Sequence, residues 1–293
     1  MKQRIGFVGV GLMGSAMARN LLAAGFSVIA HDIDSAKVEA IVEAGGKKVS
    51  SPDQIPPQVD VIIMSLPNSN DVNEAVRNSL KLFETGREGL IVLDASTIDF
   101  EVAAELVAQL RQKGIEMLDA TVSGTPLMCA AKENIFMVGG KREIFEQCEP
   151  IFAAISKEWL YMGDNGSGLV IKVIVNLVIA LNRMALAEGL TLAKKAGLDQ
   201  LQTLEVLKKS AAYSKSMDHK GYRMVNKQFV PPIGRLTNTI KSLRLALALG
   251  AKLNCPLPLL SLNVQALASE ISKGRGEWDS SDIISFYNEL ANV

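Results

Sequence analysis

The sequence contains few of the residues that mark metal, redox or nucleic-acid proteins. Of its 293 residues three are cysteine and two are histidine, and the 31 basic and 31 acidic side chains cancel. The cysteines, Cys129, Cys148 and Cys255, lie too far apart for a metal knuckle or a redox pair, so we expect no metal site and reduced, packed thiols. A chain without net charge has no general attraction for nucleic acid or an anionic membrane. Any charge selectivity must therefore be local.

The chain also lacks a long apolar run free of charge. Its N-terminus enters a glycine-punctuated strand without the apolar core of a signal peptide, which, with the cysteine usage, predicts a cytoplasmic protein. The most apolar stretch, residues 169–190, is interrupted by Lys172, Arg183 and Glu188. Charged side chains at that density are costly in hydrocarbon. We therefore expect a buried helix of a soluble protein and no membrane partner.

The distribution of apolar residues predicts two domains. From residue 3 to about 162, short β-branched runs alternate with helical segments, which is typical of βαβ units around a mainly parallel sheet. The predicted strands are Arg4–Val8, Ser27–His31, Val59–Ser65, Gly89–Asp94, Ile115–Asp119, Ile135–Val138 and Trp159–Met162. After Gly166-Ser167-Gly168 the apolar spacing becomes helical. We expect an α/β domain over residues 1–164 and an all-α domain over 165–293, joined by a long helix that starts near residue 168.

A glycine-rich turn follows the first predicted strand and opens a helix. It consists of Gly9, Val10, Gly11, Leu12, Met13 and Gly14. In dinucleotide-binding folds such glycines form the tight turn, admit the pyrophosphate and let helix and strand pack closely. Asp32 ends the next strand at the spacing of a ribose-binding acid, and its charge would repel a 2′-phosphate, so we predict NAD in preference to NADP. The alternative, that an acid here merely caps the helix at 35–44, suits Asp34 better.

Two further segments lie at the predicted carboxyl ends of strands, where ligands bind in sheets of this kind. Leu66 and Pro67 follow the third strand, and Ser96 and Thr97 follow the fourth. We consider them candidates for cofactor contacts, although an ordinary turn or helix cap explains them equally well.

Lys172 and Asn176 are the candidates for catalysis. Their spacing of four places both on one helix face among aliphatic neighbours, with Gly168 one turn earlier leaving room for a ligand. Desolvation would lower the pKa of this lysine toward the range useful for proton transfer to or from a substrate oxygen. A snorkelling lysine beside a core asparagine is the alternative. Histidine catalysis is less favoured, because His31 adjoins the ribose site and His219 lies in a polar segment.

The segment 119–125 is predicted to be a turn of small residues after a strand. Its backbone N–H groups and hydroxyls suit a substrate carboxylate, with Ser123, Gly124 and Thr125 as the candidates. On these residues alone a plain polar loop is the simpler interpretation.

Taken with their spacing, these motifs resemble those of the β-hydroxyacid dehydrogenase family over nearly the whole chain. The resemblance implies a Rossmann domain, an all-α C-terminal domain and a homodimer or homotetramer. It also implies that Lys172 is the acid/base, that Asn176 binds the reacting oxygen, and that Ser123 and Gly124 hold a small carboxylate substrate. Lys241, in the run 241–246, would close over cofactor and substrate, and Thr97 would contact the nicotinamide side.

The chain departs from the family pattern at several pocket positions. Thr121 replaces a proline, Thr125 a glycine and Ser242 an aspartate, and Gly234-Arg235 stands where relatives carry an aromatic residue. The resemblance as a whole implies hydride transfer between NAD and a short 3- or 4-hydroxy acid or its semialdehyde, whereas these departures lie at positions that would select the individual substrate. An imine reductase-like enzyme and a catalytically silent NAD-binding module are the alternatives.

Overall fold

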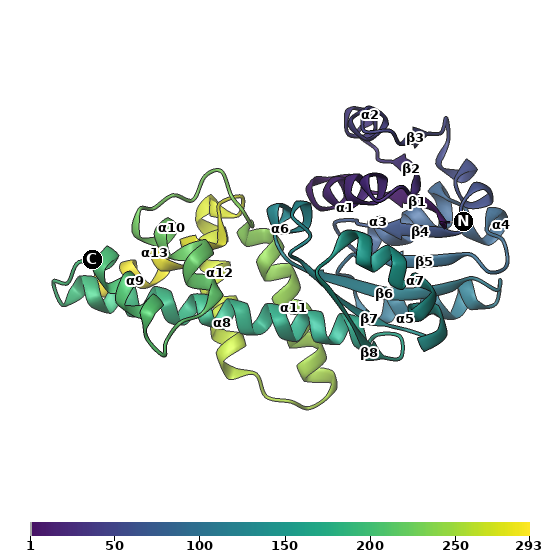
Figure 1. The fold of residues 1–293 in the computed structure, drawn as a ribbon. Helices are drawn as coiled ribbons and strands as arrows, with labels where there is room; N and C mark the ends of the chain where they lie inside the picture. Colours follow the sequence, from purple (N-terminus) through teal and green to yellow (C-terminus); the bar gives the residue numbers. More distant parts are fainter. Residues whose placement is uncertain (1) are drawn as a thin grey trace. The chain divides into compact units, whose positions relative to one another are not determined.

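The computed structural model describes residues 2–293, which divide into two compact units. The first extends to Lys172 and the second runs from Val173 to Val293. The division falls inside helix α8 (Ser167–Lys195), which begins one residue before the predicted start of the long helix (Figure 1). The expected order, an α/β unit followed by an all-α unit, is confirmed.

The first unit is built on an eight-stranded sheet with the order β3-β2-β1-β4-β5-β6-β7-β8. The strands are β1 (Arg4–Val8), β2 (Ser27–His31), β3 (Lys47–Lys48), β4 (Val61–Met64), β5 (Ile91–Asp94), β6 (Glu116–Ser123), β7 (Ile135–Gly139) and β8 (Glu158–Gly163). All neighbours are parallel except β6 and β7. The seven predicted strands are confirmed. The sequence analysis missed β3, because two exposed lysines carry no apolar alternation.

Helices cover both faces of this sheet (Figure 1). They are α1 (Leu12–Ala23), α2 (Ser35–Val42), α3 (Ser69–Glu74), α4 (Leu82–Thr85), α5 (Phe100–Arg111), α6 (Pro126–Ala130) and α7 (Arg142–Ile155), with short turns η1 (Pro52–Gln54), η2 (Pro56–Gln58) and η3 (Ala75–Ser79). Alternate residues of each strand enter separate cores: Val61 and Ile63 lie in one, Ile62 and Met64 in the other. This period of two explains why continuous β-branched runs mark strands buried on both faces.

The predicted turn at 119–125 is wrong over its first part. Strand β6 continues through Ser123 and pairs with β7 from Asp119 to that residue. The β-branched side chains Thr121 and Val122 are buried in the paired strand, which suits their conformational preference. The loop therefore starts at Gly124, later than the small residues indicated.

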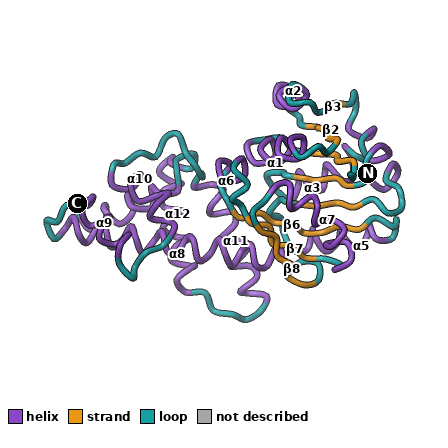
Figure 2. The backbone as a smooth tube through the Cα atoms, in the orientation of Figure 1, coloured by secondary structure: helices purple, strands orange, loops and turns teal. Residues whose placement is uncertain are grey.

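The second unit is entirely helical in the described residues, and Figure 2 colours no strand in it. It contains the rest of α8 with α9 (Gln200–Lys209), η4 (Met217–Gly221), α10 (Tyr222–Val225), α11 (Leu236–Lys252), α12 (Pro258–Glu270), η5 (Ile271–Arg275), η6 (Ser280–Asp282) and α13 (Ile283–Ala291). Helix α8 is long and apolar enough to span a membrane by length and composition alone, and 33% of its most apolar window is buried.

The three cysteines are free thiols. Cys129 and Cys148 are buried, and burial raises their pKa values to about 11 and about 12, so both stay protonated at neutral pH. Cys255 is exposed, and the prediction that all three thiols are packed is wrong for this one.

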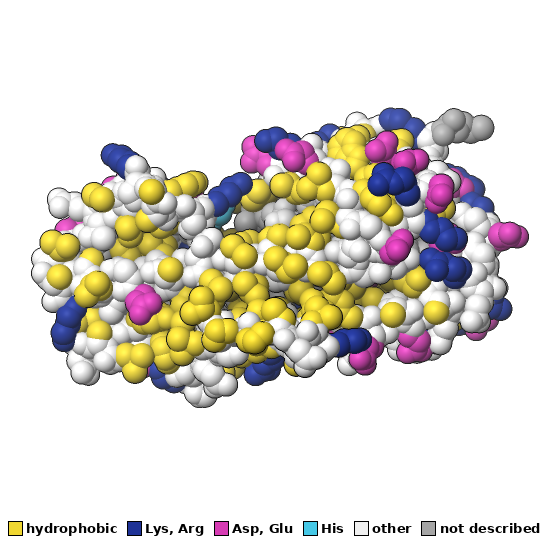
Figure 3. Space-filling view, turned by 90° about the horizontal axis from the view of Figure 1, so that it is seen from below, with side chains coloured by type: hydrophobic (Ala, Val, Ile, Leu, Met, Phe, Trp, Pro, Cys, Tyr) yellow, Lys and Arg dark blue, Asp and Glu magenta, His cyan; other side chains and the backbone are white. Residues whose placement is uncertain are grey.

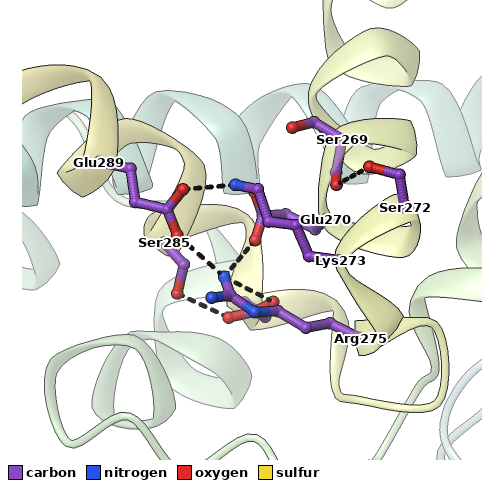
Figure 4. A network of polar contacts seen from close by, with 8 residues as sticks. Ser269, Glu270, Ser272, Lys273, Arg275, Ser285 and Glu289 are labelled. Carbon is purple, nitrogen blue, oxygen red and sulfur yellow. Dashed lines mark hydrogen bonds and ion pairs between the residues drawn. The ribbon is translucent and has the colours of Figure 1, made fainter.

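A network of charged side chains joins α12, η5 and α13 (Figure 4). Glu270 is fully buried and accepts a hydrogen bond from Lys273 at 2.8 Å and another from Arg275. Arg275 also contacts Glu289 at 3.2 Å. Because a buried carboxylate is costly without its cations, this network stabilises the corner between the last helices.

Replacing Glu270 is expected to weaken the second unit. In Glu270→Gln, two cations lose their buried partner, and the free energy of unfolding should fall by about 2 to 4 kcal/mol in denaturant titrations followed by circular dichroism. The control is Glu277→Gln, which breaks an exposed pair with Arg235 and should cost less than about 1 kcal/mol. Equal losses in the two variants would contradict this assignment.

Candidate cofactor and substrate site

The glycine-rich turn connects β1 to α1. Gly9 has a φ of +86°, and a Cβ there would lie 2.4 Å from the Ser65 carbonyl oxygen; a Cβ at Gly14 would lie 2.0 Å from the oxygen of Gly9. At these two positions glycine is required by the packing of the protein's own backbone, whether or not a ligand binds. A Cβ at Gly11, in contrast, would meet no atom within 4 Å. The turn therefore leaves open backbone at the start of α1, as close approach of a pyrophosphate requires.

Asp32 follows β2 and lies beside this turn. Its carboxylate accepts hydrogen bonds from the backbone N–H groups of Val10 at 2.9 Å and Asp34 at 3.0 Å. Asp34 caps α2 by accepting from Ala36 N, so the prediction that Asp34 and not Asp32 is the cap is confirmed. Lys37 Nζ lies 3.8 Å from Asp32 Oδ1 and balances part of its charge.

The other two predicted cofactor segments lie on neighbouring strand ends. The Ser96 hydroxyl accepts a hydrogen bond from Leu66 N at 2.9 Å, which joins the loops after β4 and β5. Ser96 is buried, so its hydroxyl holds the Leu66-Pro67 loop in place, whereas Thr97 is half-buried. Strands β2, β1, β4 and β5 are adjacent and parallel, so the residues that follow them lie together at the carboxyl ends of these strands. These residues are the glycine turn, Asp32, Leu66 and Ser96.

The first turn of α8 is fixed onto β6. Asp119 accepts from Gly166 N at 2.9 Å and Leu169 N at 3.1 Å, and Thr121 Oγ1 donates to Gly168 O at 2.8 Å. A Cβ at Gly168 would lie 2.3 Å from Asp119 O, so this glycine makes room for the strand. Our expectation that it makes room for a ligand is wrong. Burial raises the pKa of Asp119, and the two backbone N–H groups oppose that shift.

Lys172 lies one turn beyond this anchored end. Desolvation lowers the pKa of its ammonium group to about 8, as the aliphatic surroundings predicted, while the electrostatic interaction with Cys129 acts in the opposite direction. Cys129 Sγ lies 3.8 Å from Met13 Sδ in the glycine turn. Through Cys129, the structure thus brings Lys172 close to the predicted cofactor site.

The remaining predicted residues lie on loops and helices of both units. The Ser123 hydroxyl forms no hydrogen bond within residues 2–293, Gly124 is exposed, and Thr125 caps α6 by accepting from Met128 N at 3.2 Å. In the second unit, Asn176 follows Lys172 by one turn of α8, and Lys241 lies half-buried on α11. Their roles toward a substrate stay predictions.

The sequence analysis missed a polar residue on the face of α8 that carries Asn176. Arg183 follows Asn176 by seven residues, or about two helical turns, and is 9% exposed. The heptad spacing was the available signal, but we treated Arg183 only as an interruption of an apolar stretch. Our description of Lys172 and Asn176 as lying among aliphatic neighbours alone therefore overlooked Arg183 on the same helix face.

In a comparison with known proteins, each half of the chain matches the model of a known protein family. Residues 4–163 match the model of the NAD-binding domain of 6-phosphogluconate dehydrogenase, and residues 166–287 match the NAD-binding domain of NADP-dependent 3-hydroxyisobutyrate dehydrogenase.

Individual relatives match over nearly their whole length. The chain is 30% identical to 2-(hydroxymethyl)glutarate dehydrogenase of Eubacterium barkeri (99% of this chain, 96% of the relative) and 31% identical to glyoxylate/succinic semialdehyde reductase 1 of Arabidopsis thaliana (96% of each). Among solved structures, 3-hydroxyisobutyrate dehydrogenase of Mycobacterium tuberculosis aligns with a TM-score of 0.87 and 26% identity, covering 97% of this chain and 99% of that one.

The open backbone at Gly11 allows nucleotide binding at this turn to be tested. Gly11→Ala adds a methyl group where no protein atom stands, so the melting temperature should stay unchanged while the Kd for NAD, measured by calorimetry, rises at least about tenfold. Gly14→Ala is the contrasting variant, because its methyl group meets Gly9 O and should lower the melting temperature. Unchanged NAD affinity in Gly11→Ala would show that the nucleotide does not approach this turn.

Proposed function

The chain belongs to the β-hydroxyacid dehydrogenase family of NAD(P)-dependent oxidoreductases, and from that membership we propose that it interconverts a short 3- or 4-hydroxy acid and its semialdehyde. The observation that carries the proposal is the desolvated Lys172 ammonium beside Cys129 and the glycine turn. Bound nicotinamide supplies the hydride acceptor in oxidation and the hydride donor in reduction. The protein must then supply a proton carrier and hold the substrate.

Lys172 fits the role of the proton carrier. With a pKa of about 8, its amine and ammonium forms are both present near neutral pH, so it accepts the hydroxyl proton in oxidation and returns a proton in reduction. The Asn176 amide forms no hydrogen bond within residues 2–293 and follows Lys172 by one helical turn. It is therefore available to donate to the same substrate oxygen.

The substrate carboxylate is assigned to the loop after β6. The free Ser123 hydroxyl and the backbone N–H groups of Gly124 and Thr125 are donors that suit a carboxylate. A Cβ at Gly124 would lie 2.9 Å from Asn134 Cβ, so only glycine fits there without displacing its neighbour. Lys241 is a half-buried residue of α11, and its proposed role as a closing residue rests on the family resemblance alone.

NAD is the proposed cofactor in preference to NADP, because the Asp32 carboxylate repels a 2′-phosphate. Asp32→Asn keeps an acceptor for Val10 N but removes the charge, so the ratio of kcat/KM for NADP to that for NAD should rise at least about tenfold. The matched control, Asp34→Asn, changes the cap of α2 and should leave that ratio unaltered. A wild-type enzyme that prefers NADP would refute the assignment.

The proposed partners are a small carboxylate substrate and a second copy of the chain. Apolar side chains are open to solvent on the face shown in Figure 3. On α8, the large apolar side chains Ile174 and Val178 are 45% and 49% exposed. A surface of this kind favours a homo-oligomer. Cytoplasmic location stays a prediction.

Lys172→Ala tests the catalytic proposal. The variant should bind NAD normally but lose turnover of 3-hydroxyisobutyrate and related hydroxy acids by at least about three orders of magnitude, read from the nicotinamide absorbance. In the wild type, kcat/KM for oxidation should rise with pH up to about 8 and then level, because proton abstraction requires the neutral amine. Reduction requires the ammonium form and should decline above that pH.

Three outcomes separate the alternatives. Near-normal turnover in Lys172→Ala refutes the role of the lysine. Reduction of cyclic imines, with no activity on hydroxy acids, favours an imine reductase-like enzyme. Binding of NAD by the wild type without turnover of any substrate favours a silent module.

A further inference from the structure

A cluster of cationic side chains surrounds a single carboxylate inside the second unit. Lys220 in η4 is 7% exposed, and Asp279 is fully buried. Lys220 Nζ contacts both oxygens of Asp279, at 2.8 and 2.7 Å. Arg223 Nε lies 3.8 Å from Asp279 Oδ1, and Arg183 of α8 interacts electrostatically with both Asp279 and Lys220. Three cations therefore meet one anion.

The hydrogen-bonding capacity of Asp279 is already used. Besides Lys220, its oxygens accept from Ile233 N at 2.7 Å, Gly234 N at 3.1 Å, and the N–H and hydroxyl of Ser281 at 2.9 and 2.7 Å. A carboxylate offers about four lone-pair sites, and six contacts occupy them. Asp279 therefore has no acceptor left for Arg183.

Arg183 has no hydrogen-bond partner within residues 2–293. It is 9% exposed, and its Nε is buried without an acceptor. Buried arginines are normally paired, because desolvating a guanidinium is costly and it stays protonated inside proteins. Its fork of donors matches a carboxylate. The surplus positive charge and the unused donors together make this position suitable for binding an anion from outside the protein.

The position of Arg183 on α8 places this candidate anion site on the same helix face as Asn176. Asn176 and Arg183 lie on one face of α8, about 10 Å apart along its axis. Both side chains lean toward the helix N-terminus, and the arginine side chain is the longer of the two, so the guanidinium reaches part of the way toward Asn176. Gly234 keeps the approach to Lys220 open, since a Cβ built there would meet only Lys220 Nζ, at 4.0 Å. The family's usual aromatic residue at this position would fill that space.

We propose that Arg183, backed by the charge of Lys220, binds a second, distal carboxylate of the substrate, so that the enzyme acts on a short dicarboxylate carrying a hydroxymethyl or aldehyde group. This inference rests on the proposed function and narrows its substrate class. Arg183 recognises the end of the substrate remote from the reacting carbon, while Asn176 binds the reacting oxygen.

Three alcohols with the same reacting group test the proposal in the wild type with NAD. The first is 2-(hydroxymethyl)glutarate, the second carries an amide in place of its distal carboxylate, and the third is 3-hydroxyisobutyrate, which has only a methyl group there. A charge-assisted bidentate contact should give the dicarboxylate a kcat/KM at least about tenfold above those of the other two. Equal values would overturn the proposal.

Two variants assign the effect to Arg183. In Arg183→Met, which keeps the length of the side chain, KM for the dicarboxylate should rise about 10- to 100-fold, while KM for 3-hydroxyisobutyrate changes less than about twofold. Arg183→Lys should retain part of the preference, and Arg244→Met, which removes an exposed arginine of α11, should retain all of it. A preference unchanged in Arg183→Met would overturn the proposal.

The design separates this inference from the function on which it rests. A wild type that oxidises none of the three alcohols contradicts the proposed function. A wild type that oxidises them all equally well contradicts only the second carboxylate site. If Arg183→Met fails to fold, as melting curves would reveal, the comparison of dicarboxylate and amide in the wild type and in Arg183→Lys decides the question.

Discussion

The attachment of the first turn of α8 to strand β6 is the interaction on which the candidate site depends. Asp119 accepts two backbone N–H groups of that turn, and Thr121 donates to its Gly168 carbonyl. The two contacts with Asp119 satisfy N–H groups of the kind that every helix N-terminus leaves unpaired. All of these contacts hold the first turn of α8 on the sheet within the first unit. Lys172, one turn later, consequently lies beside Cys129 and close to the glycine turn.

The parts of the structure that follow from local pattern were predictable. Seven strands, the glycine turn, the long helix and the cap at Asp34 each follow from periodicity or turn chemistry. The sequence analysis failed where a residue serves a distant partner. From the sequence we expected Gly168 to leave room for a ligand, but the backbone carbonyl oxygens of Asp119 and Met137 occupy that space. Sequence spacing carries no information about such tertiary neighbours, so its prediction fails there.

Helix α8 carries two desolvated cations that behave differently. Desolvation brings the pKa of Lys172 to about 8, within reach of a proton-transfer cycle. The same effect on Arg183 lowers its pKa only to about 10, so the guanidinium stays charged. One residue type therefore suits proton exchange and the other suits permanent attraction of an anion. The choice of lysine at one position and arginine at the other matches the two tasks proposed for this helix.

Three of the departures from the family pattern, Thr121, Thr125 and Gly234, divide into two groups once their contacts are known. Thr121 ties β6 to α8, and Thr125 caps α6, so both side chains have structural partners in the first unit. Gly234 instead removes a side chain beside Lys220, near a guanidinium that has no partner. A change that opens space next to unpaired charge alters what can bind, whereas a change that adds an internal hydrogen bond alters how the fold is held. Differences in substrate should therefore arise chiefly in the second unit, while the first keeps the cofactor site common to the family.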